Sequence, residues 1–162
     1  MKRFFAVLLA AAIAAASSAV SIAPVMAQNA PTKFDPSRDP AKDVAAAAAS
    51  AKKQGKRVIV DVGGEWCSWC HILDRFIDDN ADIRAQLDRG YVWVKVNWSK
   101  DNKNEAYLSR LPAIQGYPHL FVLDADGKLL HSQDTGVLES GKGYDKAKFA
   151  DFLRTWSPAR AT

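Results

Sequence analysis

The sequence predicts an α/β domain built on a mixed β-sheet, and three observations point to this class. Short runs of β-branched and aromatic residues alternate along the chain with segments of helical spacing, as expected for a sheet covered by helices. The last two strand-like runs are separated only by the turn sequence DADG at 124–127, which predicts a hairpin. The 162 residues suffice for one such domain with a core of ordinary size.

The N-terminal end has the features of a secretory signal peptide. Lys2 and Arg3 precede an uncharged apolar run over 4–16, and a stretch of polar and small residues follows up to Ala27. The apolar run is shorter than the roughly 20 residues that span a bilayer, so we expect a cleaved signal over 1–27 rather than a membrane anchor. The style of the signal is bacterial, which predicts a periplasmic location where disulfides are permitted.

The first helix has clear start and stop signals. Asp39-Pro40 is typical of a helix start, with the aspartate as cap and the proline at the first helical position. An alanine-rich stretch favours helix up to Gln54, and Gly55 ends it. The polar segment before this helix carries two prolines and is expected to be flexible. The chain is thus divided into a signal (1–27), a flexible leader (28–38), the domain (39–157) and a tail (158–162).

The later elements follow from composition and periodicity. Strands are predicted where β-branched and aromatic residues gather, over 57–62, 91–98, 120–123 and 128–132. Helices are predicted from sequence spacing over 71–79, 80–89, 105–110 and 145–156. The glycine-containing segment 136–144 is expected to be a loop. Four aromatic side chains are expected in the core: Trp93, Trp98, Phe121 and Trp156.

Composition excludes several classes of function. The chain has only 2 cysteines, which rules out a disulfide-rich scaffold and a four-cysteine zinc site. A net charge of +4 with no basic cluster gives no reason to expect nucleic-acid binding. Both methionines, Met1 and Met26, lie in the predicted signal, so the mature protein would contain none.

The cysteine pair carries the chemistry that the sequence predicts. Cys67 and Cys70 have C-x-x-C spacing, directly after a strand of buried type and at the start of a helix. The amides and the dipole at a helix N-terminus stabilise a thiolate, which makes the first cysteine the better nucleophile. Two intervening residues allow the second sulfur to resolve a mixed disulfide. We therefore assign Cys67 as the attacking thiolate and Cys70 as the resolving thiol.

Other interpretations of the pair are weaker. A disulfide that closes so short a loop constrains little chain entropy, so it would be a poor structural staple. With His71 the motif is C-x-x-C-H, which is the attachment sequence of c-type haem. The mature chain has no methionine as a distal ligand, however, and the motif follows a hydrophobic strand. A copper or zinc site on the same residues lacks an evident fourth ligand. No cofactor and no metal are expected.

From about Val58 to Trp156 the sequence resembles the thioredoxin superfamily. The strand over 58–62 with its acidic residue, followed by Trp66-Cys67-Ser68-Trp69-Cys70, is similar to the family's strand and W-C-x-x-C motif. Asp61 lies six residues before Cys67, which is the family spacing for a buried acid. The resemblance also covers three positions further along the chain, namely Lys95, the Gly116-Tyr117-Pro118 sequence that is similar to the cis-proline loop, and Gly136.

The resemblance implies a thioredoxin fold and a role for each matching residue. Asp61 would be a buried carboxylate with a raised pKa that moves a proton to or from Cys70. Pro118 would be cis, and Tyr117 would offer backbone hydrogen bonds to an extended substrate. The remaining assignments are an apolar substrate contact at Trp66 and modulating roles for Lys95 and His71. The sequence departs from the family pattern at Gly63-Gly64, which replaces an aromatic and a small residue.

These features predict a periplasmic thiol–disulfide oxidoreductase that exchanges its dithiol or disulfide with protein cysteines. Because W-C-x-x-C with a buried acid resembles the reducing branch of the family, we expect a reductase that a membrane thiol-electron donor keeps reduced. The alternatives are a dithiol oxidase and a c-type haem-binding protein. The sequence does not indicate the oligomeric state.

Overall fold

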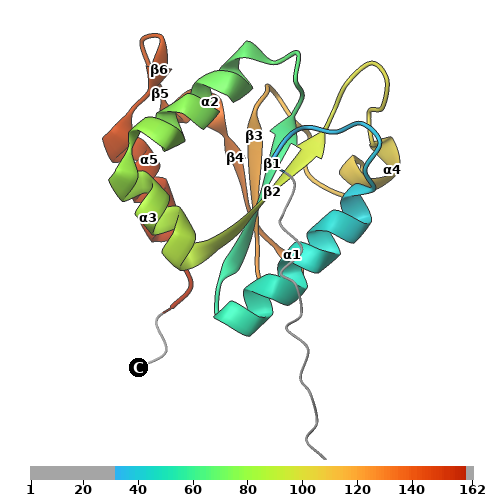
Figure 1. The fold of residues 1–162 in the computed structure, drawn as a ribbon, viewed down its shortest axis with the longest axis horizontal. Coiled ribbons are helices and arrows are strands. Elements are labelled where there is room, and N and C mark those ends of the chain that lie inside the picture. The colour runs from blue at the N-terminus through green and yellow to red at the C-terminus, as the bar shows by residue number, and fades with distance from the viewer. Residues whose placement is uncertain (1–31, 160–162) are drawn as a thin grey trace, which may run out of the picture.

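The computed structural model describes residues 32–159, and the predicted signal peptide lies outside this part of the chain. The fold has a four-stranded sheet in the order β2-β1-β3-β4, with helices on both faces (Figure 1). The strands are β1 (Arg57–Gly63), β2 (Tyr91–Asn97), β3 (His119–Leu123) and β4 (Leu129–Asp134). β1 is parallel to β2 and antiparallel to β3, which in turn pairs antiparallel with β4. The sheet is therefore mixed, as the sequence predicts.

The helices form two layers, one on each face of the sheet. α1 (Pro40–Gln54) covers one face and lies on the same side as the short α4 (Glu105–Leu108) (Figure 1). α2 (Ser68–Asp79), α3 (Ala81–Gly90) and α5 (Lys146–Thr155) cover the other face. Among the described residues no helix is both long and apolar enough to cross a membrane.

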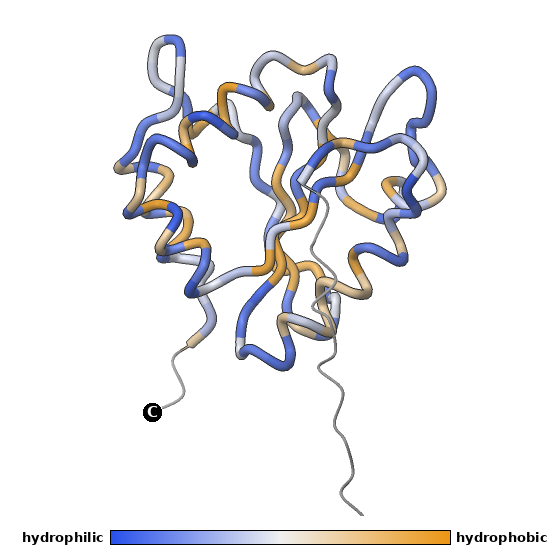
Figure 2. Tube along the Cα trace, viewed as in Figure 1, coloured by the Kyte–Doolittle hydropathy of each residue, from blue (hydrophilic) through white to orange (hydrophobic). Residues whose placement is uncertain are grey.

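β1 lies at the centre of the core, and its C-terminal end leads to the cysteine motif. Val58, Val60 and Val62 pack in the cluster that includes α1, whereas Ile59 packs in the cluster beneath α2, α3 and α5. Figure 2 shows the apolar residues concentrated along these central strands. Because side chains alternate along a strand, Asp61 shares the face of Ile59 and points toward the α2 layer.

The first helix ends as predicted. Asp39 accepts hydrogen bonds from the backbone N–H groups of Ala41 and Lys42, and Gly55 adopts a left-handed conformation with φ +64°. The structure adds detail in the predicted loop 136–144. That segment contributes to a 3-10 turn, η1 (Thr135–Leu138), and to a small hairpin of β5 (Glu139–Ser140) and β6 (Gly143–Tyr144). Two-residue strands are too short for a period-2 pattern to be visible in a sequence.

The described part of the segment before α1 packs on the domain. The predicted flexible leader covers 28–38, and its described part begins at residue 32. Phe34 in this part is only 2% exposed and packs against the two cysteines. The polar, proline-containing composition of the segment does not indicate that this aromatic ring is buried beside the cysteines.

Candidate active site

The site begins where β1 turns into α2. Cys67 is the N-cap of α2, and its Sγ accepts a hydrogen bond from the Cys70 backbone N–H at 3.1 Å. The two cysteines form a disulfide with their Cα atoms 5.3 Å apart, and both are buried. A free amide at a helix N-terminus favours negative charge on the atom that it faces. The local geometry is therefore suited to stabilising a thiolate at Cys67 when the pair is reduced.

The two glycines before the motif permit this close packing. A Cβ atom at Gly63 would lie 2.5 Å from Cys70 Sγ and 3.0 Å from Cζ of Phe34. A Cβ atom at Gly64 would meet the Trp66 ring and would lie 2.8 Å from the carbonyl oxygen of Trp98. The departure from the family pattern at these positions thus has a steric reason, because neighbouring groups already occupy the space of a side chain.

Asp61 and Lys95 form a buried ion pair on the face of the sheet that α2 covers. They are register partners on β1 and β2, and Lys95 Nζ lies 3.4 Å from Asp61 Oδ2. Asp61 is 1% exposed, and neither of its carboxylate oxygens accepts a hydrogen bond. Burial raises the pKa of Asp61 to about 6, the positive charge of Lys95 opposes this, and the negative charge of Asp74 adds to it.

Asp74 is a site residue that sequence reasoning missed. Its Oδ1 accepts a hydrogen bond from Lys95 Nζ at 2.6 Å, which is shorter than the distance from Lys95 to Asp61. Lys95 is therefore shared between a fully buried and a half-exposed carboxylate. The spacing contains a usable signal, since Asp74 lies four residues after Cys70 and thus on the same face of the predicted helix.

An aromatic cluster of Trp66, Trp98 and Tyr117 adjoins the cysteine pair through Tyr117. Trp66 is 54% exposed, and its ring meets those of Trp98 and Tyr117 edge-on at centroid distances of 5.8 and 5.6 Å. Trp98, which the sequence predicts in the core, is partly buried against the core cluster that includes α1 and also stacks on Tyr117 at 4.9 Å. Its backbone oxygen accepts a hydrogen bond from the Trp66 indole at 2.7 Å. This hydrogen bond joins Trp66 and Trp98, which are 32 positions apart in the chain. A local sequence pattern cannot indicate a contact over that separation.

The Tyr117–Pro118 peptide bond is cis, as predicted. Pro118 is buried, and its carbonyl oxygen accepts a hydrogen bond from the Thr135 hydroxyl at 2.6 Å. Tyr117 also packs against the cluster of Phe34 and the two cysteines, so the predicted substrate loop and the cysteine motif lie side by side. The structure brings these segments together although about fifty residues separate them in the sequence.

His71 is placed beside the motif but turned toward Glu65. Its Nε2 lies 2.8 Å from the carbonyl oxygen of Glu65 and 4.0 Å from Glu65 Oε2. The polar contacts of the His71 ring are thus with Glu65. In the described part of the chain, no group of three or more His, Cys, Asp or Glu side chains is arranged to hold a metal ion.

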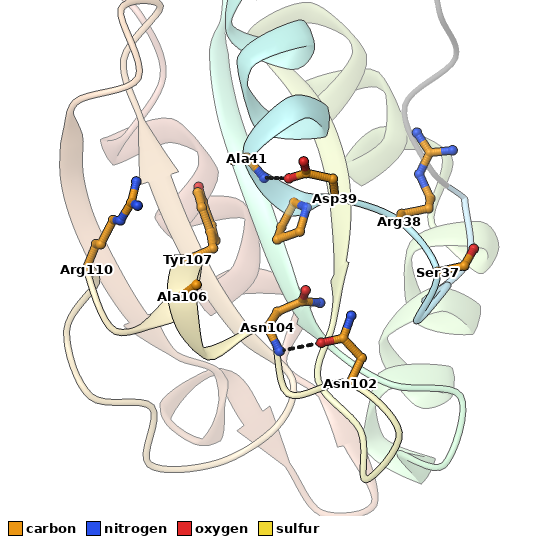
Figure 3. A pocket seen from close by; sticks show the side chains of 10 residues that line it. Ser37, Arg38, Asp39, Ala41, Asn102, Asn104, Ala106, Tyr107 and Arg110 are labelled. Carbon is orange, nitrogen blue, oxygen red and sulfur yellow. Dashed lines mark hydrogen bonds between the residues drawn. The ribbon is translucent and has the colours of Figure 1, made fainter.

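A separate hollow of about 320 Å³ lies between the start of α1 and α4 (Figure 3). It contains none of the residues of the cysteine site. Its polar groups are largely paired within the chain, since Asp39 caps α1 and Arg38 donates to Asp43 at 2.6 Å. We do not assign a function to this hollow.

The fold and the cysteine site together define a thioredoxin-like protein. A family model described as thioredoxin-like matches residues 39–125, and the chain belongs to this family. The family and the disulfide-forming pair identify it as a thiol–disulfide oxidoreductase.

Similar curated proteins are the thiol:disulfide interchange proteins DsbD of Colwellia psychrerythraea and Klebsiella pneumoniae. The chain is 30% identical to the first over 86 residues and 27% identical to the second over 107 residues. The matches cover 52% and 65% of this chain but only 14% and 17% of the relatives. The chain therefore corresponds to a small part of each relative.

Solved structures with the same fold include a disulphide isomerase from Xylella fastidiosa, with a TM-score of 0.65 at 24% identity. That match covers 79% of this chain and 97% of the isomerase. The C-terminal domain of DsbD from Neisseria meningitidis, in its oxidised form, has a TM-score of 0.56 at 19% identity, with coverage of 76% and 98%. At these identities the likeness establishes the fold.

Proposed function

We propose that this chain is a periplasmic thiol–disulfide reductase that transfers two electrons to disulfides of other proteins. The observation that carries the proposal is the placement of Cys67 Sγ at the N-terminus of α2, where it accepts a hydrogen bond from the Cys70 amide at 3.1 Å. This arrangement favours a thiolate on Cys67, and the buried carboxylate of Asp61 is assigned as the proton acceptor for Cys70.

The first step is attack by the Cys67 thiolate on one sulfur of a substrate disulfide. A bond forms between Cys67 Sγ and that sulfur, and the substrate S–S bond breaks. The other substrate sulfur leaves as a thiolate and takes a proton from solvent. The exposed Trp66 ring and the Tyr117–Pro118 backbone are assigned to hold the substrate segment in an extended conformation beside the cysteines.

The second step is attack by Cys70 on Cys67 Sγ. The Cys70 thiol gives its proton to the carboxylate of Asp61, and the new thiolate displaces the second substrate sulfur, which leaves as a thiolate and is protonated by solvent. The chain is left with the Cys67–Cys70 disulfide, which is the state in the structure. With a pKa of about 6, Asp61 is ionised at neutral pH and is a better proton acceptor than an ordinary carboxylate.

Lys95 and His71 are assigned to adjust these steps rather than to take part in them. Lys95 lies 3.4 Å from Asp61 and 2.6 Å from Asp74, so it sets how strongly the buried acid holds a proton. His71 lies against Glu65, at the edge of the motif, where its charge would act on Cys67 only at longer range.

The direction and the location rest on the sequence. The W-C-x-x-C motif with a buried acid resembles the reducing branch of the family, and the predicted signal over 1–27 directs the chain to the periplasm. The similar curated proteins are named as interchange proteins, which agrees with exchange between protein thiols. A membrane thiol donor would return the disulfide to the dithiol, since the reaction consumes one reduced pair per turnover.

The direction is tested by the equilibrium reduction potential of the Cys67–Cys70 pair in glutathione buffers. A reductase is expected near the value of thioredoxin, about −270 mV, whereas a value near −120 mV would establish a dithiol oxidant and overturn the assigned direction. Insulin reduction by the purified chain is the matching activity assay. The location is tested by cell fractionation, and the exported protein is expected to begin at Gln28.

A further inference from the structure

Phe34 belongs to the redox centre although it precedes the segment 39–125 that the family model matches. Its side chain is 2% exposed and forms one cluster with Cys67 and Cys70. Trp69 and Tyr117 pack against the same cluster. In Figure 1 the segment that precedes α1 crosses beside the carboxyl ends of β1 and β2. The described part of the N-terminal segment thus contributes a wall of the site.

The ring of Phe34 covers the buried side of the cysteine pair. The tip of the ring and Cys70 Sγ both border the space next to Gly63, where a Cβ atom would lie 3.0 Å from Phe34 Cζ and 2.5 Å from the sulfur. The same ring lies under the head of Lys95, with Nζ 4.1 Å from the ring centroid. One side chain therefore contacts the surroundings of the resolving cysteine and the lysine that pairs with Asp61.

The segment is held in this position at two points. The backbone N–H of Phe34 donates a hydrogen bond to Glu65 Oε1 at 2.9 Å. Two residues further on, the carbonyl oxygen of Pro36 accepts one from the side chain of Asn102 at 2.8 Å. Glu65 belongs to the turn that leads into the cysteine motif, so the anchor of the segment and the motif are part of the same local structure.

We propose that Phe34 is a positioning residue of the redox centre, whose ring seals Cys70 and the head of Lys95 from water. The charged and titratable groups that face Asp61 come from three elements, namely Lys95 on β2, Asp74 on α2 and Tyr144 on β6. Without the ring, water reaches Lys95 and the space beside Cys70. The charged form of Asp61 is then better solvated, and the Cys70 thiol becomes open to small reagents.

This inference concerns the same cysteine pair as the proposed function, but its test measures protection from solvent and not the direction of electron flow. The two can therefore fail separately. A pair that works as an oxidant would still be sealed by Phe34, and a reductase could still operate with an unsealed Cys70.

The test compares Phe34→Ala with Phe34→Leu, which keeps apolar bulk at this position. Iodoacetamide labelling of each cysteine in the reduced native protein is followed by peptide mass spectrometry. We expect Cys70 in Phe34→Ala to be labelled at least about tenfold faster than in the wild type, and Cys70 in Phe34→Leu to stay within about twofold. The proposal would be overturned if Cys70 were labelled at the same rate in Phe34→Ala and the wild type. It would also be overturned if Cys70 were labelled as fast in Phe34→Leu as in Phe34→Ala.

A second measurement distinguishes exclusion of water by the Phe34 ring from a general loss of stability in the variant. In the oxidised protein the cysteines do not titrate. The pH dependence of the Asp61 carboxyl carbon signal in NMR therefore reports the titration of Asp61 without a contribution from the cysteine thiols. We expect the Asp61 midpoint to move to lower pH in Phe34→Ala and to stay near the wild-type value in Phe34→Leu. A folded Phe34→Ala protein with an unchanged midpoint would contradict the proposal.

If Phe34→Ala does not fold, the anchor provides a milder pair of variants. Glu65→Ala removes the acceptor of the Phe34 N–H without touching the core, whereas the amide oxygen of Glu65→Gln still accepts that bond. We expect Cys70 labelling to increase about two- to fivefold in Glu65→Ala and to remain unchanged in Glu65→Gln. The same rate in both variants would overturn the proposal.

Discussion

Two groups of residues near the Cys67–Cys70 disulfide, which we call the outer and the inner side, are built from different kinds of residue. The outer side is formed by the aromatic rings of Trp66, Trp98 and Tyr117, of which Trp66 is 54% exposed. The inner side holds Asp61 and Lys95, which are 1% and 7% exposed and carry opposite charges. The proposed function assigns a different role to each side, with partner contact on the outer side and control of protons on the inner side.

This difference has an energetic basis. Apolar rings at the surface lose little by exposure and gain when a partner covers them. A buried carboxylate, in contrast, destabilises the folded chain unless it is neutralised or well paired, and Asp61 has only a 3.4 Å contact with a lysine that Asp74 also holds. The inner side thus carries a stability cost that the outer side does not. Substitutions at five positions test the comparison, in order of decreasing expected effect.

Removal of a cysteine tests the centre that both sides share. Cys67→Ser should abolish insulin reduction because no nucleophile remains to open the substrate disulfide. Cys70→Ser should accumulate mixed disulfides through Cys67, seen as high-mass species on non-reducing gels that disappear on reduction. The double variant is the control and should trap nothing. Trapping through Cys70 in the Cys67→Ser protein would reverse the assignment of the two sulfurs.

Asp61→Asn tests the cost of the inner side. A pKa raised from 3.8 to about 6 means that the folded chain binds more protons than the unfolded chain between these values, so stability falls as the pH rises from about 4 to about 6. The shift corresponds to about 3 kcal/mol above this window. We therefore expect the oxidised Asp61→Asn protein to be more stable than wild type at pH 7, by up to about this amount, in urea unfolding.

The same variant has an internal control in its pH dependence. Below about pH 4 the wild-type carboxyl is protonated in both states, so the gain from Asp61→Asn should vanish there. Lys95 keeps Asp74 as a partner at 2.6 Å, so the substitution does not leave an unpaired buried charge. A gain of equal size at pH 4 and pH 7 would show that the ionisation of Asp61 is not its origin.

Gly63→Ala tests the packing between the two sides. The added methyl group would lie 2.5 Å from Cys70 Sγ, which the disulfide holds in place, and 3.0 Å from Phe34. Overpacking of this kind destabilises by about 2 kcal/mol, measured as a shift of the urea midpoint. Gly143→Ala is the matched control, because a Cβ atom at Gly143 meets nothing within 4 Å. A similar loss of stability in Gly63→Ala and Gly143→Ala would show that close packing at Gly63 is not the cause.

Trp66→Ala tests the outer side. The variant should raise KM for a protein disulfide about fivefold, equivalent to roughly 1 kcal/mol, and leave kcat nearly unchanged, because the ring contacts substrate but not the reacting sulfurs. Val137→Ala is the control, since Val137 is 60% exposed but belongs to η1 and is not part of the aromatic cluster. If kcat falls instead of KM rising, Trp66 acts on the chemistry and the two sides are not separate.

Local patterns in the sequence were sufficient for the main parts of the fold and the motif. The mixed sheet, the helix capped by Asp39 and Gly55, and the helix start at the cysteines follow from periodicity and capping, which involve residues close in the chain. Asp61 and the cis bond at Pro118 came from the resemblance to thioredoxins, whose spacing the sequence preserves.

The sequence by itself determined the reaction class, because Cys67 and Cys70 three residues apart at a helix start already define the chemistry. Only the tertiary structure decided what surrounds the pair. Phe34, Asp74 and Trp98 take part through contacts with distant residues, from 19 positions for Trp98 with Tyr117 to 61 positions for Phe34 with Lys95. Such contacts arise from the packing of whole elements, and Phe34 lines the site because its ring is buried against the cysteine pair. Periodicity reports which face of an element is apolar, but not which distant side chain fills the space beside it.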